Sequence, residues 1–351
     1  MVSRLLSHNT FMQNTVEENT EIIPPLQSKT VKVVANVFLL KSCSVLLAVI
    51  LHFTIDHFYG PEGVGAFGLY MSVITITGLL ASFGFGNAAL KLSGAVGSDQ
   101  ELASVQSAYN MMLRLTSVAA GVCAVFVLFS AQKMSEVFLD DPYKAPVFYC
   151  SALAILPFAL LEVSSEMIRG RGKTNLYMIF KETGLWLAAA PVLIFLLVSQ
   201  YGYLSPIVSH LVAVLMFSVV AILVVQELLK PAEEVEHPNS ISISNLLKLS
   251  LPMLMSKGLL WAGFWIDILI AGVFMGGADI GIYLVLDRIA AFGKQVSYSI
   301  NVYVAPRIAY HFQQKRLKHL EKLTKDSVRY SVWILAPIMI ILAIVAKPVL
   351  G

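Results

Sequence analysis

Charged residues are scarce in this chain: 13% of its 351 residues are Asp, Glu, Lys or Arg, whereas 57% are hydrophobic. A soluble domain usually contains about 25% charged residues. The composition therefore excludes an ordinary water-soluble domain and predicts an integral membrane protein.

Cysteine is also rare. Cys43, Cys123 and Cys150 all lie in apolar runs, without paired spacing or a neighbouring histidine. Disulfide frameworks and zinc sites require such spacing. We expect three buried thiols and no metal site.

The motifs of common enzyme classes are absent. The sequence contains no HExxH, GxSxG or Walker pattern, and His52, His57 and His210 are isolated. The glycine-rich stretches 60–68 and 276–281 lack the Lys-Ser/Thr and the preceding strand of a phosphate loop. Glycine there is expected to permit tight outer turns and close helix packing. The chain is predicted not to be an enzyme, to need no cofactor and to bind no nucleic acid.

Long hydrophobic runs are the main feature that the sequence does contain. A membrane-spanning helix needs about 20 apolar residues. On this criterion the sequence predicts an all-α polytopic bundle of about nine spans, near residues 34–56, 66–89, 108–130, 146–167, 177–198, 204–226, 250–273, 279–304 and 331–347. Four prolines fall inside spans: Pro157, Pro191, Pro252 and Pro337. Either they kink helices that bend during transport, or they reflect the general frequency of proline in membrane helices.

The distribution of positive charge predicts the orientation. With the N-terminus inside, sixteen Lys and Arg residues lie in inner connections and only Lys133 and Lys144 lie in outer ones. Inner loops are normally the basic ones, so the N-terminus is predicted to be cytoplasmic. Residues 1–31 are polar, contain Pro24-Pro25 and are expected to form a flexible cytosolic tail.

An internal repeat organises the spans. A shift of 216 residues aligns Lys41 with Lys257, Gly60 with Gly276 and Gly65 with Gly281, without a gap. Six spans lie between equivalent points of the two copies. Because six is an even number, both copies have the same orientation in the membrane. Parallel repeats of this kind place the substrate path at the interface between the two halves. The predicted organisation is a six-span lobe at 32–226, a cytosolic linker at 227–247 and, at 248–351, the first three spans of a second lobe that is incomplete here.

Charges inside the predicted spans mark a candidate pathway, because a charge at the bilayer centre costs roughly 2.5–3.5 kcal/mol. Lys41 and Lys257 lie roughly 10 Å from the inner edge of their spans. In the eighth span, Lys294 is expected in the inner half and Arg288 nearer the middle. Together they predict a cationic inner-half cavity that attracts an anionic head group, since Arg and Lys both suit phosphate. Secondary candidates are Arg114 and Lys181 at the inner side and Asp267 and Asp287 in the outer half. The alternative for Lys41, Lys257, Lys181 and Arg114 is that their side chains extend to the interface. The basic segment 307–330 is either an interfacial helix or an extension of span eight.

Several stretches resemble the oligosaccharide flippases, or polysaccharide transporters, of the multidrug/oligosaccharidyl-lipid/polysaccharide exporter superfamily. They are Leu251-Pro252, WIDILIAG (265–272), GGADIGIYLVLDRI (276–289), APRI (305–308), YGPEGVGAFGLY (59–70) and ASFGFGNAALKL (81–92). The resemblance implies that the chain translocates an undecaprenyl-pyrophosphate-linked oligosaccharide across the bacterial inner membrane. The export would serve surface polysaccharides such as O-antigen, lipopolysaccharide, capsule or exopolysaccharide.

The same resemblance implies alternating access, a coupling ion (H⁺ or Na⁺), contacts with membrane lipids, and polymerase or chain-length proteins as partners. Members usually have twelve to fourteen spans, so the shorter chain keeps open a truncated, non-transporting remnant. A drug or cation antiporter of the same superfamily is a second alternative, and it predicts an acidic cavity. A membrane glycosyltransferase or polymerase is a third, but these usually have a sizeable catalytic outer loop, and the outer loops here are short.

Overall fold

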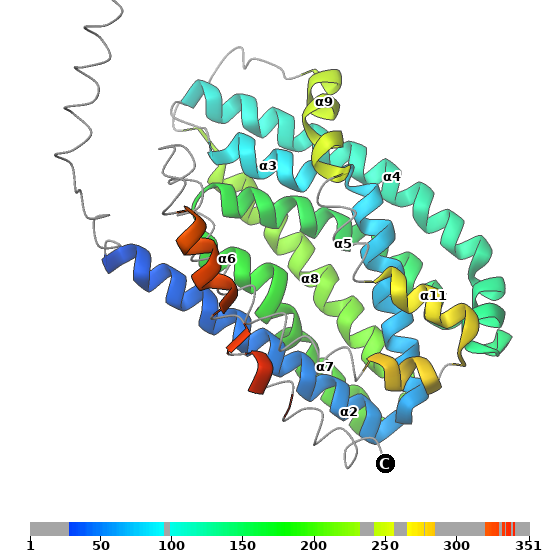
Figure 1. The fold of residues 1–351 in the computed structure, drawn as a ribbon. Helices are drawn as coiled ribbons and strands as arrows, with labels where there is room; N and C mark the ends of the chain where they lie inside the picture. The colour runs from blue at the N-terminus through cyan, green and yellow to red at the C-terminus, as the bar shows by residue number, and fades with distance from the viewer. Residues whose placement is uncertain are drawn as a thin grey trace, which may run out of the picture.

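The computed structural model describes residues 28–94, 99–231, 242–255, 265–276, 278–284 and 320–329, with a few residues between 332 and 340. All regular structure in these ranges is helical, and Figure 1 shows the helices packed side by side as a bundle. Within the described part, five helical stretches are long and apolar enough to cross a membrane: Leu39–Ala81, Gln100–Leu139, Pro142–Gly170, Thr174–Val198 and Ser205–Leu228. The predicted all-α membrane bundle is therefore confirmed.

Helix α2 (Ser28–Ala81) contains the first predicted span and most of the second. The helical conformation breaks at Gly60, where φ is 66° and ψ is −175°, and Pro61 follows. A left-handed φ of this kind strongly favours glycine. The chain changes direction sharply at this point (Figure 1), so the predicted turn is confirmed, while its place on the outer side of the membrane stays a prediction.

The second glycine-rich stretch packs against this turn. A Cβ on Gly281 would overlap the backbone carbonyl of Pro61, and one on Gly68 would overlap the side chain of Leu284. Two small residues thus allow the 278–284 helix to approach the start of the second span closely. The predicted use of glycine for helix packing is confirmed here.

A second break divides the predicted span 66–89. Helix α2 ends at Ala81, Phe83 and Gly84 have φ values of 48° and 71°, and helix α3 (Phe85–Gly94) then begins. Helix α9 (Ile243–Met253) packs against α3 beside this break. The contact joins the predicted first lobe to the beginning of the predicted second lobe.

Helices α4 (Asp99–Leu139) and α5 (Pro146–Gly170) form the next pair of spans. Between them lies the short 3-10 helix η1 (Pro142–Lys144), whose first turn is capped by the Asp141 carboxylate accepting from the Tyr143 amide. Helix α5 contacts α2, α3, α4 and α8 and is therefore central. Its buried face contains many alanines and serines, which permit close packing between membrane helices.

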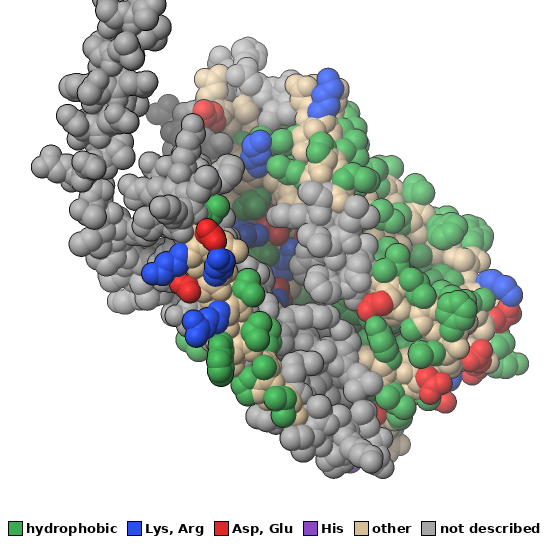
Figure 2. All heavy atoms as spheres, viewed as in Figure 1, with side chains coloured by type: hydrophobic (Ala, Val, Ile, Leu, Met, Phe, Trp, Pro, Cys, Tyr) green, Lys and Arg blue, Asp and Glu red, His purple; other side chains and the backbone are tan. Residues whose placement is uncertain are grey.

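One further predicted span is built from three pieces. Helix α6 (Thr174–Met178) leads into the π-helical turn η2 (Ile179–Thr183) and then α7 (Gly184–Val198). Helix α8 (Ser205–Leu228) returns alongside α7. Large apolar side chains on α4, α7 and α8 are exposed, as expected for a surface in contact with lipid; many of the green side chains on the right of Figure 2 belong to this class.

The second predicted lobe is described only in part. It includes α9, α11 (Ile266–Phe274) and the helical residues 278–284 and 320–329. Residues 1–27 of the predicted tail 1–31 and residues 232–241 of the linker lie outside the described residues, as do most of spans eight and nine. The predicted lobe boundaries, the parallel repeat and the cytoplasmic N-terminus therefore stay predictions.

Candidate functional site

A cavity of about 260 Å³ lies among the helices of the first predicted lobe. It is bounded by both halves of α2, by α5, by η2 with the start of α7, by α8 and by Trp265 just before α11. Figure 2 shows charged side chains of both signs inside a hollow near the middle of that view. The polar side chains that line the cavity are Lys41, Ser44, Thr75, Glu162, Ser165, Lys181, Glu182 and His210.

The first ion pair of the cavity links α2 to η2. The Lys41 Nζ donates to Glu182 Oε1 over 2.6 Å, and the two side chains are 27% and 21% exposed. Beside it, the Thr183 hydroxyl donates to the backbone carbonyl of Leu40 over 2.8 Å. The first span is therefore attached to the π-helical turn by a charged and a neutral contact.

The second ion network links η2 to α5. The Lys181 Nζ donates to Glu162 Oε1 over 2.8 Å and to Glu166 Oε1 over 3.0 Å. The Glu166 side chain is only 7% exposed and also accepts from Arg169, over 3.2 Å. Both cations lie near the Tyr177 ring, with 5.2 Å from its centroid to Arg169 Cζ and 5.5 Å to Lys181 Nζ.

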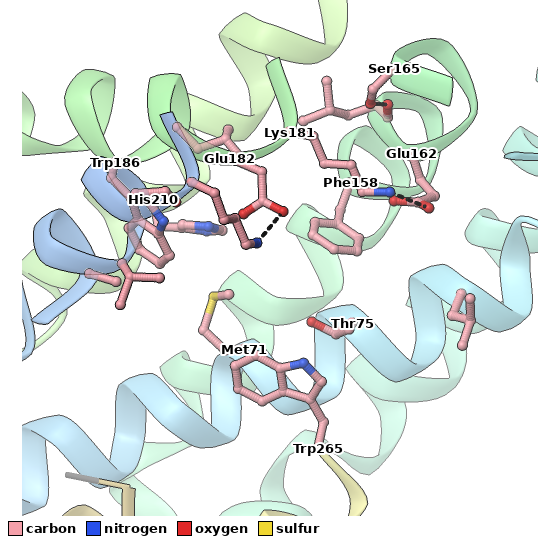
Figure 3. Close-up of a pocket in the computed structure, with 17 residues that line it drawn as sticks. Met71, Thr75, Phe158, Glu162, Ser165, Lys181, Glu182, Trp186, His210 and Trp265 are labelled. Atoms are coloured by element: carbon pink, nitrogen blue, oxygen red, sulfur yellow. Dashed lines mark hydrogen bonds and ion pairs between the residues drawn. The ribbon is translucent and has the colours of Figure 1, made fainter. Parts of the chain in front are cut away.

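The π-helical turn explains how adjacent residues serve different partners. Single π turns within α-helices are rare and often occur at functional sites. Here Lys181 is directed towards α5 and Glu182 towards α2 (Figure 3), so one widened turn lies between both helices and pairs with each. Intramembrane charges normally pair with one another or face a water-filled cavity, and these residues pair with one another and line a cavity.

The aromatic end of the cavity is organised around His210 of α8. Its Nδ1 lies 3.0 Å from the Tyr70 hydroxyl, and its ring centroid lies 5.6 Å from that of Trp186. Figure 3 shows Trp186 beside His210, with Trp265 near Met71 and Thr75. The cavity therefore combines paired charges with walls that are largely apolar and aromatic.

The structure places four of the predicted site residues. Lys41 and Lys181 line the cavity, whereas Arg114 is exposed on α4 and is not among the lining residues. Asp267 begins α11, where it accepts from the Ile268 amide and, over 2.9 Å, from the Tyr283 hydroxyl, and it does not line the cavity. Lys257, Asp287, Arg288 and Lys294 lie outside the described residues.

Three carboxylates were missed in the sequence prediction: Glu162, Glu166 and Glu182. The signal that selected the lysines, an ionisable residue inside a span, applies equally to them. With them included, the described part of the cavity is charge-balanced and not cationic, because each lining lysine has a carboxylate partner. Within the described residues, no three His, Cys, Asp or Glu side chains converge as metal ligands would.

Exchanging the charges of Lys41 and Glu182 tests their coupling. Each single reversal, Lys41→Glu or Glu182→Lys, places like charges together and is expected to lower the midpoint of thermal unfolding. The double exchange is expected to recover it, with a coupling free energy of about 1 kcal/mol.

A surface pair provides the matched control for that cycle. Lys133 and Glu136 pair over 3.1 Å but are 77% and 44% exposed, so the same exchange there is expected to give coupling close to zero. Equal coupling in the two cycles would contradict a role for burial at Lys41 and Glu182.

Comparisons with known proteins agree with this fold. The sequence matches the model of a family described as "Polysaccharide biosynthesis protein" over residues 58–351. Its structure is similar to that of the MATE multidrug transporter DinF-BH, with a TM-score of 0.51 and 16% sequence identity. That similarity covers 93% of this chain and 75% of the transporter chain. No curated protein sequence matches the chain. The resemblance predicted from the sequence is thereby confirmed, and the chain belongs to the polysaccharide biosynthesis protein family.

Proposed function

We propose that this chain is a flippase that moves an undecaprenyl-pyrophosphate-linked oligosaccharide from the inner to the outer leaflet of a bacterial inner membrane. The observation that supports this most is a cavity with paired charges in its lining, among apolar spanning helices, in a member of the polysaccharide biosynthesis family. The oligosaccharide needs a polar passage, because its hydroxyl groups cannot be left without hydrogen bonds in lipid. Transport leaves the substrate chemically unchanged, so the proposed activity is not enzymatic.

The ion pairs supply a means of changing conformation. Lys41–Glu182 joins the first span to η2, and Lys181 joins η2 to α5. Protonation of a carboxylate, or entry of Na⁺ beside it, would weaken one of these links and allow the helices to separate. In the proposed mechanism a gradient of H⁺ or Na⁺ thus drives alternating access.

The pyrophosphate requires cations that are not already neutralised. Lys257, Arg288 and Lys294 remain the proposed contacts for this group, whereas Lys41 and Lys181 are neutralised by their carboxylate partners. A polymerase and a chain-length protein are the proposed recipients of the exported oligosaccharide.

Reconstitution tests the proposal directly. The full chain is placed in liposomes whose lipid-linked oligosaccharide has a fluorescent sugar, and dithionite quenching reports the fraction in each leaflet. Protein-containing vesicles are expected to equilibrate the leaflets faster than empty vesicles, and dissipating the ion gradient is expected to slow uphill transfer. Equal rates with and without the protein would overturn the proposal.

A drug or cation antiporter is the second candidate, and the carboxylates of the cavity favour it. Glu162, Glu166 and Glu182 could accept an organic cation, and a multidrug transporter shares the fold. The same liposomes loaded with a cationic rhodamine dye discriminate between the two. Gradient-dependent efflux of the dye without movement of lipid-linked oligosaccharide would favour the antiporter.

A further inference from the structure

The charge balance of the cavity indicates which part of the proposed substrate it can hold. Lys41 and Lys181 are both held by carboxylates within hydrogen-bonding distance, and Glu166 adds a further negative charge behind Lys181. With Arg169, which pairs with Glu166, the network contains three cations and three carboxylates, so an entering pyrophosphate would have to displace a carboxylate from a close ion pair. Charges of the same sign close together in a partly desolvated site repel strongly. The described cavity is therefore a poor anion site.

We propose that this cavity binds one or two neutral sugar rings of the oligosaccharide, while the pyrophosphate is bound elsewhere. This inference rests on the flippase function proposed above and adds a site that recognises which sugar the oligosaccharide contains. The assignment follows from three properties of the lining: its aromatic surfaces, its mixture of donors and acceptors, and its size.

The aromatic surfaces come from separate elements. Trp186 belongs to α7, Phe158 to α5, and Trp265 precedes α11, and all three line the cavity (Figure 3). A pyranose ring has an apolar face of C–H groups, which packs against aromatic faces and buries area on both partners. Aromatic walls on different helices would hold a ring between them.

Donors and acceptors occur together along the polar side. Lys41 and Lys181 present ammonium donors, Glu162 and Glu182 present carboxylate acceptors, and each of these side chains retains 15–27% exposure. A sugar hydroxyl both donates and accepts, so neighbouring groups of opposite charge satisfy it better than a purely cationic surface would. Hydrogen bonds to charged groups are also the stronger ones.

The size of the cavity limits how much of the oligosaccharide it can take. Its volume of about 260 Å³ lies just below the range of small-molecule pockets, which is roughly 300 to 1,000 Å³. That space suits one or two rings and not a complete repeating unit. Selection would then depend on a short terminal or lipid-proximal part of the chain.

Saturation-transfer NMR on the full chain in nanodiscs tests the assignment. The probes are free glucose, galactose, mannose, rhamnose, N-acetylglucosamine and N-acetylgalactosamine, each at about 10 mM, because contacts to a single ring support only millimolar dissociation constants. At least one sugar is expected to receive saturation. Trp186→Ala is expected to weaken its binding about two- to tenfold, as expected for loss of an aromatic contact, and Trp186→Phe is expected to retain most of it.

The control variant lies on the same helix. Phe195 is also aromatic but is exposed on the lipid-facing side of α7, so Phe195→Ala is expected to leave the sugar signal unchanged. Added inorganic pyrophosphate is expected not to displace the sugar. Absence of signal from every sugar, displacement by pyrophosphate, or equal effects of Trp186→Ala and Phe195→Ala would each overturn the inference.

The result can be separated from that of the transport assay. If the wild-type protein moves lipid-linked oligosaccharide but binds no free sugar, the sugar-site inference fails and the flippase proposal stands. If it binds sugar at Trp186 but moves no lipid-linked oligosaccharide, the flippase proposal fails and the binding site stands as a saccharide site of another function.

Discussion

Lys181→Met is expected to destabilise the protein by about 3 kcal/mol, because it leaves the buried Glu166 and the partly buried Glu162 without their shared cation. The Lys181 side chain is 15% exposed and its partner Glu166 only 7%. Methionine preserves most of the volume of the lysine side chain, so the loss reflects charge more than packing. The measurement is the free energy of unfolding of the full chain, from a denaturant titration in mixed micelles.

A compensating variant separates charge from structure in this test. Adding Glu162→Gln and Glu166→Gln to Lys181→Met removes the uncompensated negative charges, and most of the lost stability is expected to return. Arg169, which also pairs with Glu166, is 41% exposed and can reach water instead. The exposed Lys133→Met is the matched control and is expected to have little effect. A Lys181→Met protein as stable as this control would contradict the network.

Gly84→Ala is expected to destabilise the protein by about 2–5 kcal/mol, combining left-handed backbone strain with overpacking. Gly84 has a φ of 71°, and a Cβ there would lie 2.7 Å from the Ser250 carbonyl oxygen and 2.9 Å from the Leu254 amide nitrogen. These atoms are backbone, so no side-chain rotation can relieve the overlap. Transport is expected to fall as well, because the contact joins α3 to α9, which opens the predicted second lobe.

The chain offers a glycine with the opposite expectation. Gly121 lies inside α4 with no atom within 4 Å of a would-be Cβ. Gly121→Ala is expected to be neutral or to stabilise by up to about 1 kcal/mol, since alanine favours a helix interior. Both variants are compared by their midpoints of thermal unfolding. If Gly84→Ala unfolds no earlier than Gly121→Ala, the close approach of α9 to the break is refuted.

The helical architecture was predictable because its causes are local. Runs of about 20 apolar residues predict spans wherever they occur, and the glycines near residue 60 predicted the turn that Gly60 makes with its positive φ. The break after Ala81 was not predicted, although Gly84 was noted in the family-like stretch. Residues 82–89 include Ser82 and Asn87 but no charged residue, so hydropathy alone indicates only a weak interruption there.

Of the charged residues that line the cavity, only the two lysines were predicted from the sequence. Lys41 and Lys181 were found because a charge in a span is conspicuous, yet Lys41 and its partner Glu182 are 141 residues apart in sequence. No local pattern reports such a pairing. The π-helical turn makes the pairing harder to predict. Successive residues of a regular helix are rotated by about 100° about its axis, and the widened turn changes that rotation. A cationic site was therefore predicted where the described structure has a balanced one.

Helix α4 also sets a relation between this protein and the thickness of its bilayer. Arg114 and Lys133 are both exposed on α4 and stand nineteen residues apart, with exposed valines and phenylalanines between them. That separation corresponds to about 28 Å along a helix, close to the hydrocarbon thickness of roughly 30 Å. In membranes of longer-chain lipids the two charges would be drawn inward unless the bilayer thinned around the helix or their side chains reached outward. Lipids with longer acyl chains would therefore place strain on α4, the helix that packs most extensively against central α5.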